Sequence, residues 1–258
     1  PMPIRVTSRP AAVLALLLIA APAGAWDLDC RHSAERELRV DTTGVSRIEI
    51  AARAGDLEVR AGAAGQVQAR GRACASSAEF LAQTQIRSVR DGGTLKVFVQ
   101  VPDEMKGIGL FYARLDLEVD VPAGVPVEVT DSSGDATITG VQLTKLTDSS
   151  GDATLRGITG DFEVNDSSGD LRVEDAAGKV TITDSSGDVI VRGAKDVVVR
   201  SDSSGDVDIA RVAGSVRIEN DSSGDIDVTD VGHDVAVLAD TSGAVRVSGV
   251  KGTVSVPD

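Results

Sequence analysis

Two aspartates that recur at a fixed spacing are the residues of this sequence best suited to chemistry. They flank a pentapeptide, Asp-Ser-Ser-Gly-Asp, which occurs six times in the second half of the chain. Ca²⁺ prefers carboxylate and carbonyl oxygens, and such a series offers carboxylates at repeating intervals. The candidate calcium ligands are the two aspartates of each copy: Asp131 and Asp135, Asp148 and Asp152, Asp166 and Asp170, Asp184 and Asp188, Asp202 and Asp206, and Asp221 and Asp225.

The same pentapeptide also has a purely structural interpretation. Asp and Ser side chains accept hydrogen bonds from the backbone N–H groups of turns, Gly adopts positive φ, and the hydroxyls can donate to carboxylates in neighbouring copies. Near-identical copies also argue against catalysis, because an active site is normally unique. We therefore expect a turn motif, with calcium binding as the alternative.

The spacing of the copies predicts the architecture. Successive first aspartates lie 17, 18, 18, 18 and 19 residues apart, and a decayed copy begins 19 residues later at Asp240. A fixed period of this length indicates a solenoid in which each repeat is one coil. The fold class is therefore all-β, a parallel β-solenoid of about seven coils with about 18 residues per coil, and the aspartates should stack in two columns.

Each repeat contains two short segments in which apolar and polar residues alternate. Leu171 and Val173 follow one Gly-Asp, and Val180 and Ile182 follow nine residues later. Alternation with a period of two between turn residues indicates strands. Two strands and two turns make a flattened coil, and a three-sided coil remains the alternative. Its narrow third side would contain Ala176, Val212, Val231 and Val250.

Residues 26–110 lack the repeat and are expected to form a β-rich cap region that shields the open edge of the first coil. Ser76-Ser77-Ala78-Glu79 has capping-box spacing and predicts a short helix to about Thr84. Residues 111–258 then form the solenoid domain. The strands predicted before it are Glu37–Val40, Ile48–Ala51, Leu57–Arg60 and Val67–Arg70, a hairpin of Ile86–Val89 with Leu95–Val101, and Tyr112–Val121.

The first 25 residues are predicted to be a signal peptide. Arg5 and Arg9 precede an apolar run over residues 11–21, and Ala23-Gly24-Ala25 is a small-residue cleavage site. The run is too short to span a bilayer, so no transmembrane anchor is expected after cleavage and the location is periplasmic or extracellular. In that environment Cys30 and Cys74 are more consistent with a disulfide than with a metal site.

Charge and residue usage exclude several functions. Removing residues 1–25 leaves 24 basic and 40 acidic side chains, a net charge of 24 − 40 = −16, which disfavours nucleic acid and anionic membranes. The two histidines, His32 and His233, lie in different modules, so neither a Ser-His-Asp triad nor a histidine zinc site is expected. We predict no enzyme and no cofactor other than the calcium alternative.

The repeat resembles two known families. Its length is similar to that of the calcium-binding repeats-in-toxin β-roll, but the turns opposite the pentapeptide lack the regular Gly-Gly-x-Gly-x-Asp of that family. The units Asp-Ser-Ser-Gly-Asp-apolar-x-apolar and Gly-x-apolar-x-apolar behind an export signal resemble the bacterial putative-adhesin family of unknown function. That resemblance implies a β-solenoid in the cell envelope, without defined functional residues.

Three function classes follow from these patterns. The first is an exported, non-enzymatic structural or interaction protein with a protein or cell-surface partner. The second is a calcium-binding β-roll-like module that uses the stacked aspartates. The third, a polysaccharide-acting β-helix enzyme, would need a cluster of acids and bases that interrupts the repeat, and the sequence contains no such cluster. The sequence specifies neither the partner nor the oligomeric state.

Overall fold

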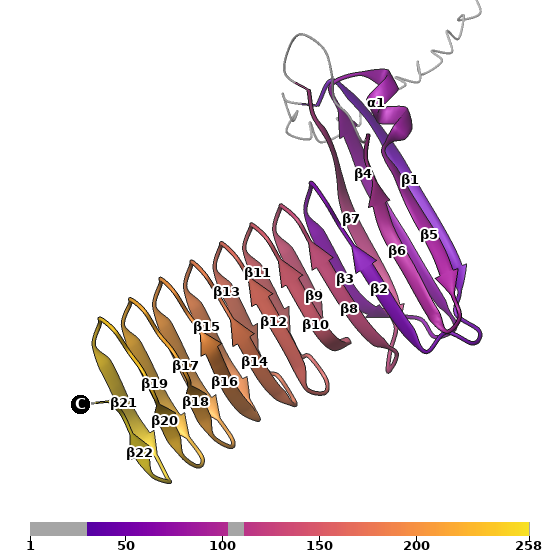
Figure 1. Cartoon of the computed structure of the whole chain (residues 1–258). Coiled ribbons are helices and arrows are strands. Elements are labelled where there is room, and N and C mark those ends of the chain that lie inside the picture. Colours follow the sequence, from indigo (N-terminus) through magenta and orange to yellow (C-terminus); the bar gives the residue numbers. More distant parts are fainter. Residues whose placement is uncertain (1–29, 103–110, 258) are drawn as a thin grey trace, which may run out of the picture.

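The protein is a flat rod built from two β-sheets that face each other (Figure 1). The computed structural model describes residues 30–102 and 111–257, so the expected signal peptide lies outside the described residues. Each sheet has eleven strands, and the strands of the array pair in parallel from coil to coil. The predicted parallel β-solenoid is therefore confirmed.

Both sheets run the full length of the rod, with their strands in the following spatial order. The first sheet contains β1 (His32–Asp41), β4 (Gln66–Ala75), β7 (Ala113–Pro122), β3 (Leu57–Gly62), β9 (Ala136–Thr139), β11 (Ala153–Arg156), β13 (Leu171–Glu174), β15 (Val189–Ala194), β17 (Val207–Val212), β19 (Ile226–Val231) and β21 (Val245–Val250). The second contains β5 (Gln85–Asp91), β6 (Thr94–Gln100), β2 (Arg47–Ala51), β8 (Pro126–Asp131), β10 (Gln142–Asp148), β12 (Phe162–Asp166), β14 (Lys179–Thr183), β16 (Asp196–Ser201), β18 (Val216–Ile218), β20 (Val235–Val237) and β22 (Val254–Ser255).

Each coil of the array has two sides, not three. A strand of the second sheet leads through the pentapeptide into a strand of the first sheet, and a second turn leads back. Val212, one of the residues considered for a third side, pairs in register with Ala194 and Val231 and thus extends the first sheet. Its side chain is 2 % exposed, so this edge of the rod is closed by apolar side chains.

The core is aliphatic and thin, because alternation sends every second side chain of each strand inward. Leu155, Val173 and Val191 pair in consecutive coils and are fully buried. Burying a side chain of this kind contributes about 1.5–3 kcal/mol relative to leaving it in water. Since the same layer repeats in every coil, the buried cluster runs without a break from β2 to β20.

The strands before the array extend the same two sheets rather than forming a separate layer. β2 pairs in parallel with β6 and β8, and β3 pairs in parallel with β7 and β9. Only β1, β4 and β5 add antiparallel pairs, at the end of the rod opposite to β21 and β22 (Figure 1). The predicted boundary near residue 110 falls outside the described residues, and strands on both sides of it share both sheets.

The predicted short helix is confirmed as α1 (Ala78–Gln83). Its N-cap is Ser77, one residue later than the capping-box spacing indicates, and the Ser77 Oγ accepts a hydrogen bond from the Phe80 N–H at 3.1 Å. The Phe80 ring packs edge-on against Phe111, with ring centroids 5.8 Å apart. No helix in the described part of the chain is long and apolar enough to cross a membrane.

The predicted disulfide between Cys30 and Cys74 is also confirmed, with Cα atoms 5.6 Å apart. Cys74 lies in β4, and Cys30 stands just before β1, the edge strand that pairs with β4. The bond therefore fastens the last strand of the first sheet to its neighbour.

Reduction of this disulfide is expected to loosen β1 and to leave the array folded. The chain-entropy model gives a stabilisation of about 4 kcal/mol for a loop of this length, and in a stacked array such a loss acts mainly on neighbouring units. Hydrogen exchange with and without reductant should show lost protection in β1 and unchanged protection in β13. The Cys30→Ser/Cys74→Ser variant should reproduce this pattern without reductant, whereas equal loss in both strands would contradict it.

Candidate functional site

The pentapeptides form one continuous edge of the rod, where the chain turns from the second sheet into the first. Asp148 pairs in register with Asp131 in one neighbouring coil and with Asp166 in the other. The structure brings all twelve predicted aspartates to this edge. It divides them, however, into one column inside the rod and another on its surface.

The first aspartate of each copy faces the interior, and these six residues are named the inner column. In β8 the inward positions are Val127, Val129 and Asp131, so the alternation that buries the valines also buries the carboxyl group. The Ser132 N–H donates to Asp131 Oδ1 at 2.7 Å, which caps the turn. All six members are at most 4 % exposed: Asp131, Asp148, Asp166, Asp184, Asp202 and Asp221.

The last aspartate of each copy lies on the surface, and these six residues are named the outer column. Each carboxylate accepts a hydrogen bond from the backbone N–H of the equivalent residue in the next coil, at 2.8–3.1 Å. The members are Asp135, Asp152, Asp170, Asp188, Asp206 and Asp225. The side chains thus form a ladder of their own beside the backbone ladder of the sheets.

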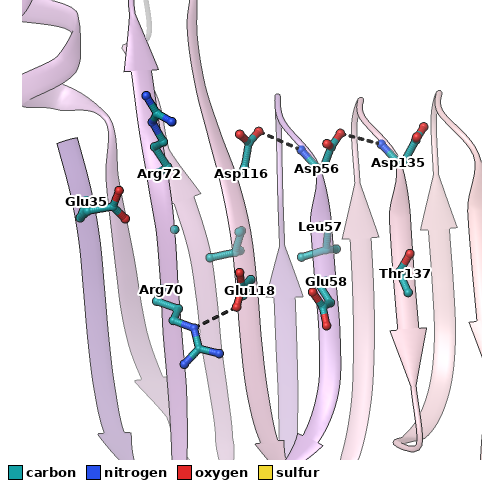
Figure 2. Close-up of a pocket in the computed structure, with 12 residues that line it drawn as sticks. Glu35, Asp56, Leu57, Glu58, Arg70, Arg72, Asp116, Glu118, Asp135 and Thr137 are labelled. Carbon is teal, nitrogen blue, oxygen red and sulfur yellow. Dashed lines mark hydrogen bonds and ion pairs between the residues drawn. The ribbon is translucent and has the colours of Figure 1, made fainter. Parts of the chain in front are cut away.

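Two residues that sequence reasoning missed continue this ladder. The Asp135 N–H donates to Asp56 Oδ1 and the Asp56 N–H donates to Asp116 Oδ1, both at 3.2 Å (Figure 2). Gly55 and Leu57 flank Asp56 as in the array, so the Gly-Asp-apolar pattern was a usable signal. The copy at Asp56 was missed because it does not follow the 18-residue period. The strands β4 to β7 lie between it and the first complete repeat. Nothing in the sequence around Asp116 marks it.

The serines and glycines bind the pentapeptides to one another. From the second copy onward, the second serine donates its hydroxyl hydrogen to the backbone carbonyl of the first serine one coil earlier, as from Ser168 to Ser149 at 3.1 Å and from Ser186 to Ser167 at 3.2 Å. In the first copy, Ser133 donates to the Arg53 carbonyl instead. The hydroxyls therefore bond carbonyls rather than the carboxylates we expected. Each glycine has a positive φ, between +112° at Gly134 and +133° at Gly224. These contacts support the turn interpretation.

The two columns differ in the pKa of their carboxyl groups. Burial, and next to it the charge of neighbouring carboxyls, raises the pKa of Asp148 and Asp221 to about 7. Burial likewise raises the pKa of Asp131, Asp184 and Asp202 to about 6, and that of Asp166 above its ordinary value. In the outer column, a hydrogen bond from Arg246 lowers the pKa of Asp225.

This geometry does not favour calcium. Ca²⁺ takes six to eight oxygens, whereas the inner and outer aspartates of one turn lie on opposite sides of the backbone. Among residues 30–102 and 111–257, no group of three acidic, histidine or cysteine side chains is placed to hold a metal.

We therefore expect millimolar calcium and the chelator EGTA to give the same melting temperature, measured by circular dichroism. The control is the outer-column variant Asp170→Asn, which should also be insensitive to calcium. A higher melting temperature in calcium that this variant abolishes would establish the calcium alternative instead.

A cleft of about 620 Å³ lies on the outer face of the first sheet, where β1, β4, β7, β3 and β9 run side by side (Figure 2). Arg70 and Arg72 of β4 stand between acidic residues of the two adjacent strands, and Arg70 Nε donates to Glu118 Oε2 at 2.9 Å. The side chain opposite Arg72 on β1 is Glu35. The lining contains no histidine, cysteine or lysine, and its arginine and carboxylate side chains supply hydrogen bonds and charge.

The two histidines are as far apart as the sequence indicated. His32 begins β1 at one end of the rod, and His233 lies in the turn before β20 near the other end. Neither contacts the pentapeptide edge.

Comparison with known proteins places these features in context. A family model described as Toastrack DUF4097 matches residues 42–196, which is more than half of the chain. No curated protein matches. A solved structure described as a putative lipid binding protein from Parabacteroides distasonis shares 15 % identity, covers 88 % of this chain and 98 % of its own, and has a TM-score of 0.55. One described as a putative adhesin from Bacteroides fragilis shares 17 % identity, with coverages of 89 % and 99 % and a TM-score of 0.50. At these identities the likeness shows the fold alone.

Proposed function

We propose that this chain, which belongs to the Toastrack DUF4097 family, is an exported non-enzymatic interaction protein that presents the acidic edge of its rod to a basic partner. The observation that carries the proposal is the outer column. Its carboxylates continue through Asp56 and Asp116, so negative charges recur along the edge at about the 4.8 Å spacing of paired strands. The hydrogen-bonded backbone holds them in place, which makes the edge a rigid charged surface.

Export is supported by two independent features. The Cys30–Cys74 disulfide is typical of proteins in oxidising compartments outside the cytoplasm. The predicted signal peptide over residues 1–25 supplies the route.

The repetition of the pentapeptide carboxyls supports a binding role rather than catalysis. The pentapeptide carboxyl groups are repeated from coil to coil, whereas an active site is normally unique, and the described histidines lie near opposite ends of the rod. Fold alone does not decide between the activities attributed to proteins of similar fold, one described as an adhesin and another as a lipid binding protein. The negative edge favours a protein or polysaccharide surface with amino or guanidinium groups over anionic lipid.

The outer column can be tested because asparagine preserves its structural role. The amide oxygen still accepts the N–H of the next coil, while the charge is removed. Mature chain would be immobilised and its retention of a cationic polysaccharide, chitosan, measured at physiological salt. We expect strong retention by the natural sequence and a loss of at least about tenfold in the variant Asp152→Asn/Asp170→Asn/Asp188→Asn, which corresponds to about 1.4 kcal/mol.

The matched control removes three charges elsewhere on the surface, in Glu35→Gln/Glu37→Gln/Glu49→Gln. It should retain chitosan almost as well as the natural sequence. Equal losses in both variants would show attraction by net charge alone and would overturn the proposed role of the edge. The same three proteins would then be coated on beads, and the number of beads bound per cell of the producing bacterium would be counted. This measurement extends the result to a natural surface.

A further inference from the structure

The inner column places six carboxyl groups inside the rod, one in each successive coil. The strand β10 pairs in parallel with β8 and β12, and this pairing sets Asp148 opposite Asp131 and Asp166. Neighbouring aspartates are therefore separated by about 4.8 Å, the spacing of paired strands. Asp202 and Asp221 continue the column through isolated parallel bridges, which reach Asp240 in the last coil. In the described part of the chain, no other region of the core contains a charged group as deeply buried.

The column lacks the partners that buried carboxylates need. One oxygen each of Asp131, Asp148 and Asp166 has no hydrogen bond, and at Asp184, Asp202 and Asp221 neither oxygen has one. The serine N–H groups beside Asp184 lower its pKa slightly but lie outside hydrogen-bonding geometry. An ionised carboxylate left unpaired in an apolar interior is so unfavourable that the group neutralises instead.

Within residues 30–102 and 111–257, the charged groups that act on the column are negative. The groups with the largest electrostatic effect on its members are other carboxyls. From the outer column and its extension these are Asp56, Asp135, Asp152 and Asp170, and from the last coil Asp240. The remaining neighbours in the core are aliphatic side chains. A positive species must therefore come from solution.

We propose that the inner column is a proton-binding site in which carboxyl groups of adjacent coils share protons and so hydrogen-bond one coil to the next. Parallel bridges place Asp202 beside Asp221 and Asp221 beside Asp240 in adjacent coils, with both oxygens of Asp202 and Asp221 free to accept or share a proton. Ionised carboxylates have only acceptors, so each such contact requires one protonated partner. An O–H···O⁻ bond between a carboxyl and a carboxylate is short and about twice as strong as a neutral one.

A proton fits the column better than a metal ion. A gap between two coils offers oxygens from two carboxyls, and the described residues contain no group of three ligands there. A proton needs only one donor and one acceptor oxygen. Proton sharing gives the rod a further set of contacts along its axis, in addition to the backbone ladders and the hydrogen bonds of the outer aspartates and serines. This set forms in mild acid and is lost in alkali.

Infrared spectroscopy of the mature chain tests this directly, because a protonated carboxyl has a C=O stretching band distinct from that of a carboxylate. At pH 6 to 7 the natural sequence should show the band, although ordinary Asp and Glu are ionised there. The inner-column variant Asp166→Asn/Asp184→Asn/Asp202→Asn should lose roughly half of it, since it removes three of the six groups. The outer-column variant Asp152→Asn/Asp170→Asn/Asp188→Asn should keep it.

A second measurement does not depend on a variant that folds. Unfolding the natural sequence in urea at pH 6, with the pH held constant, should release more than one proton per chain, because free aspartates ionise below this pH. Three results would overturn the proposal. They are the release of no protons on unfolding, the absence of the infrared band from the natural sequence, and a band of unchanged intensity in the inner-column variant. A band that appears only after EGTA treatment would also overturn it, since a metal ion would then hold the carboxylates.

Discussion

The substitution Gly187→Ala is expected to destabilise the rod by roughly 3–5 kcal/mol, through strain at a backbone conformation that disfavours side chains and through overpacking of the turn. Gly187 has a φ of +127°, and a Cβ at this position would overlap the carbonyl group of Gly169 in the previous coil. That carbonyl belongs to the stacked turn and cannot move without breaking neighbouring hydrogen bonds. For a domain of this size the loss corresponds to a fall in melting temperature of roughly 6–20 °C.

Gly157 provides the matched control. It also has a positive φ, +59°, but lies in the opposite turn, where a Cβ would have no neighbour within 4 Å. Gly157→Ala should therefore cost only about 1–2 kcal/mol, the ordinary penalty of a left-handed alanine. Circular dichroism melts of the two variants decide the matter. Similar melting temperatures would mean that the pentapeptide turns are not stacked as closely as described.

The coil was predictable from the sequence because its two signals agree. The period fixes which residues are equivalent, and the alternation of residues such as Leu171 and Val173 fixes which of them face inward. The insertion of β2 and β3 into the stack was not predictable. Their parallel partners β8 and β9 lie more than 60 residues further along the chain, and no repeat of the pentapeptide links them.

The candidate site shows where residue type misled the interpretation. Val127, Val129 and Asp131 occupy alternate positions of one strand and so point to the same face of the sheet. Alternation alone therefore places the first aspartate inside the rod. The sequence interpretation stacked the aspartates in two columns without assigning either one to the interior, although aspartate is usually exposed. The structure follows the alternation. A register that buries the two valines also buries Asp131, because this residue lies two positions further along the same strand. The penalty falls on the carboxyl groups, whose pKa values rise.

Raising the pH from about 5 to 8 is expected to lower the melting temperature of this protein by roughly 10 °C or more. The folded pKa is about 6 for Asp131, Asp184 and Asp202 and about 7 for Asp148 and Asp221, against 3.8 for an ordinary aspartate, and burial also raises the pKa of Asp166. Between these values the folded state binds more protons than the unfolded state, so the free energy of unfolding falls as the pH rises. The stabilisation is complete below about pH 4 and is lost as the pH passes through 7.

The size of this effect follows from the same shifts. A rise of about two pKa units corresponds to about 3 kcal/mol for one independent group. Shared protons make neighbouring groups interdependent, so their contributions do not simply add. We therefore expect the free energy of unfolding to fall by about 5 kcal/mol in total. Each kcal/mol corresponds to a fall of roughly 2–4 °C in melting temperature.

The variant Asp166→Asn/Asp184→Asn/Asp202→Asn separates this effect from general repulsion in an acidic protein. Its buried amides stay neutral at every pH, so its melting temperature should depend on pH only about half as steeply and should exceed that of the natural sequence at pH 8. The outer-column variant Asp152→Asn/Asp170→Asn/Asp188→Asn removes the same number of carboxyl groups from the surface. Because those carboxylates are solvated, this variant should keep the full pH dependence, and equal flattening in both would assign the effect to surface repulsion.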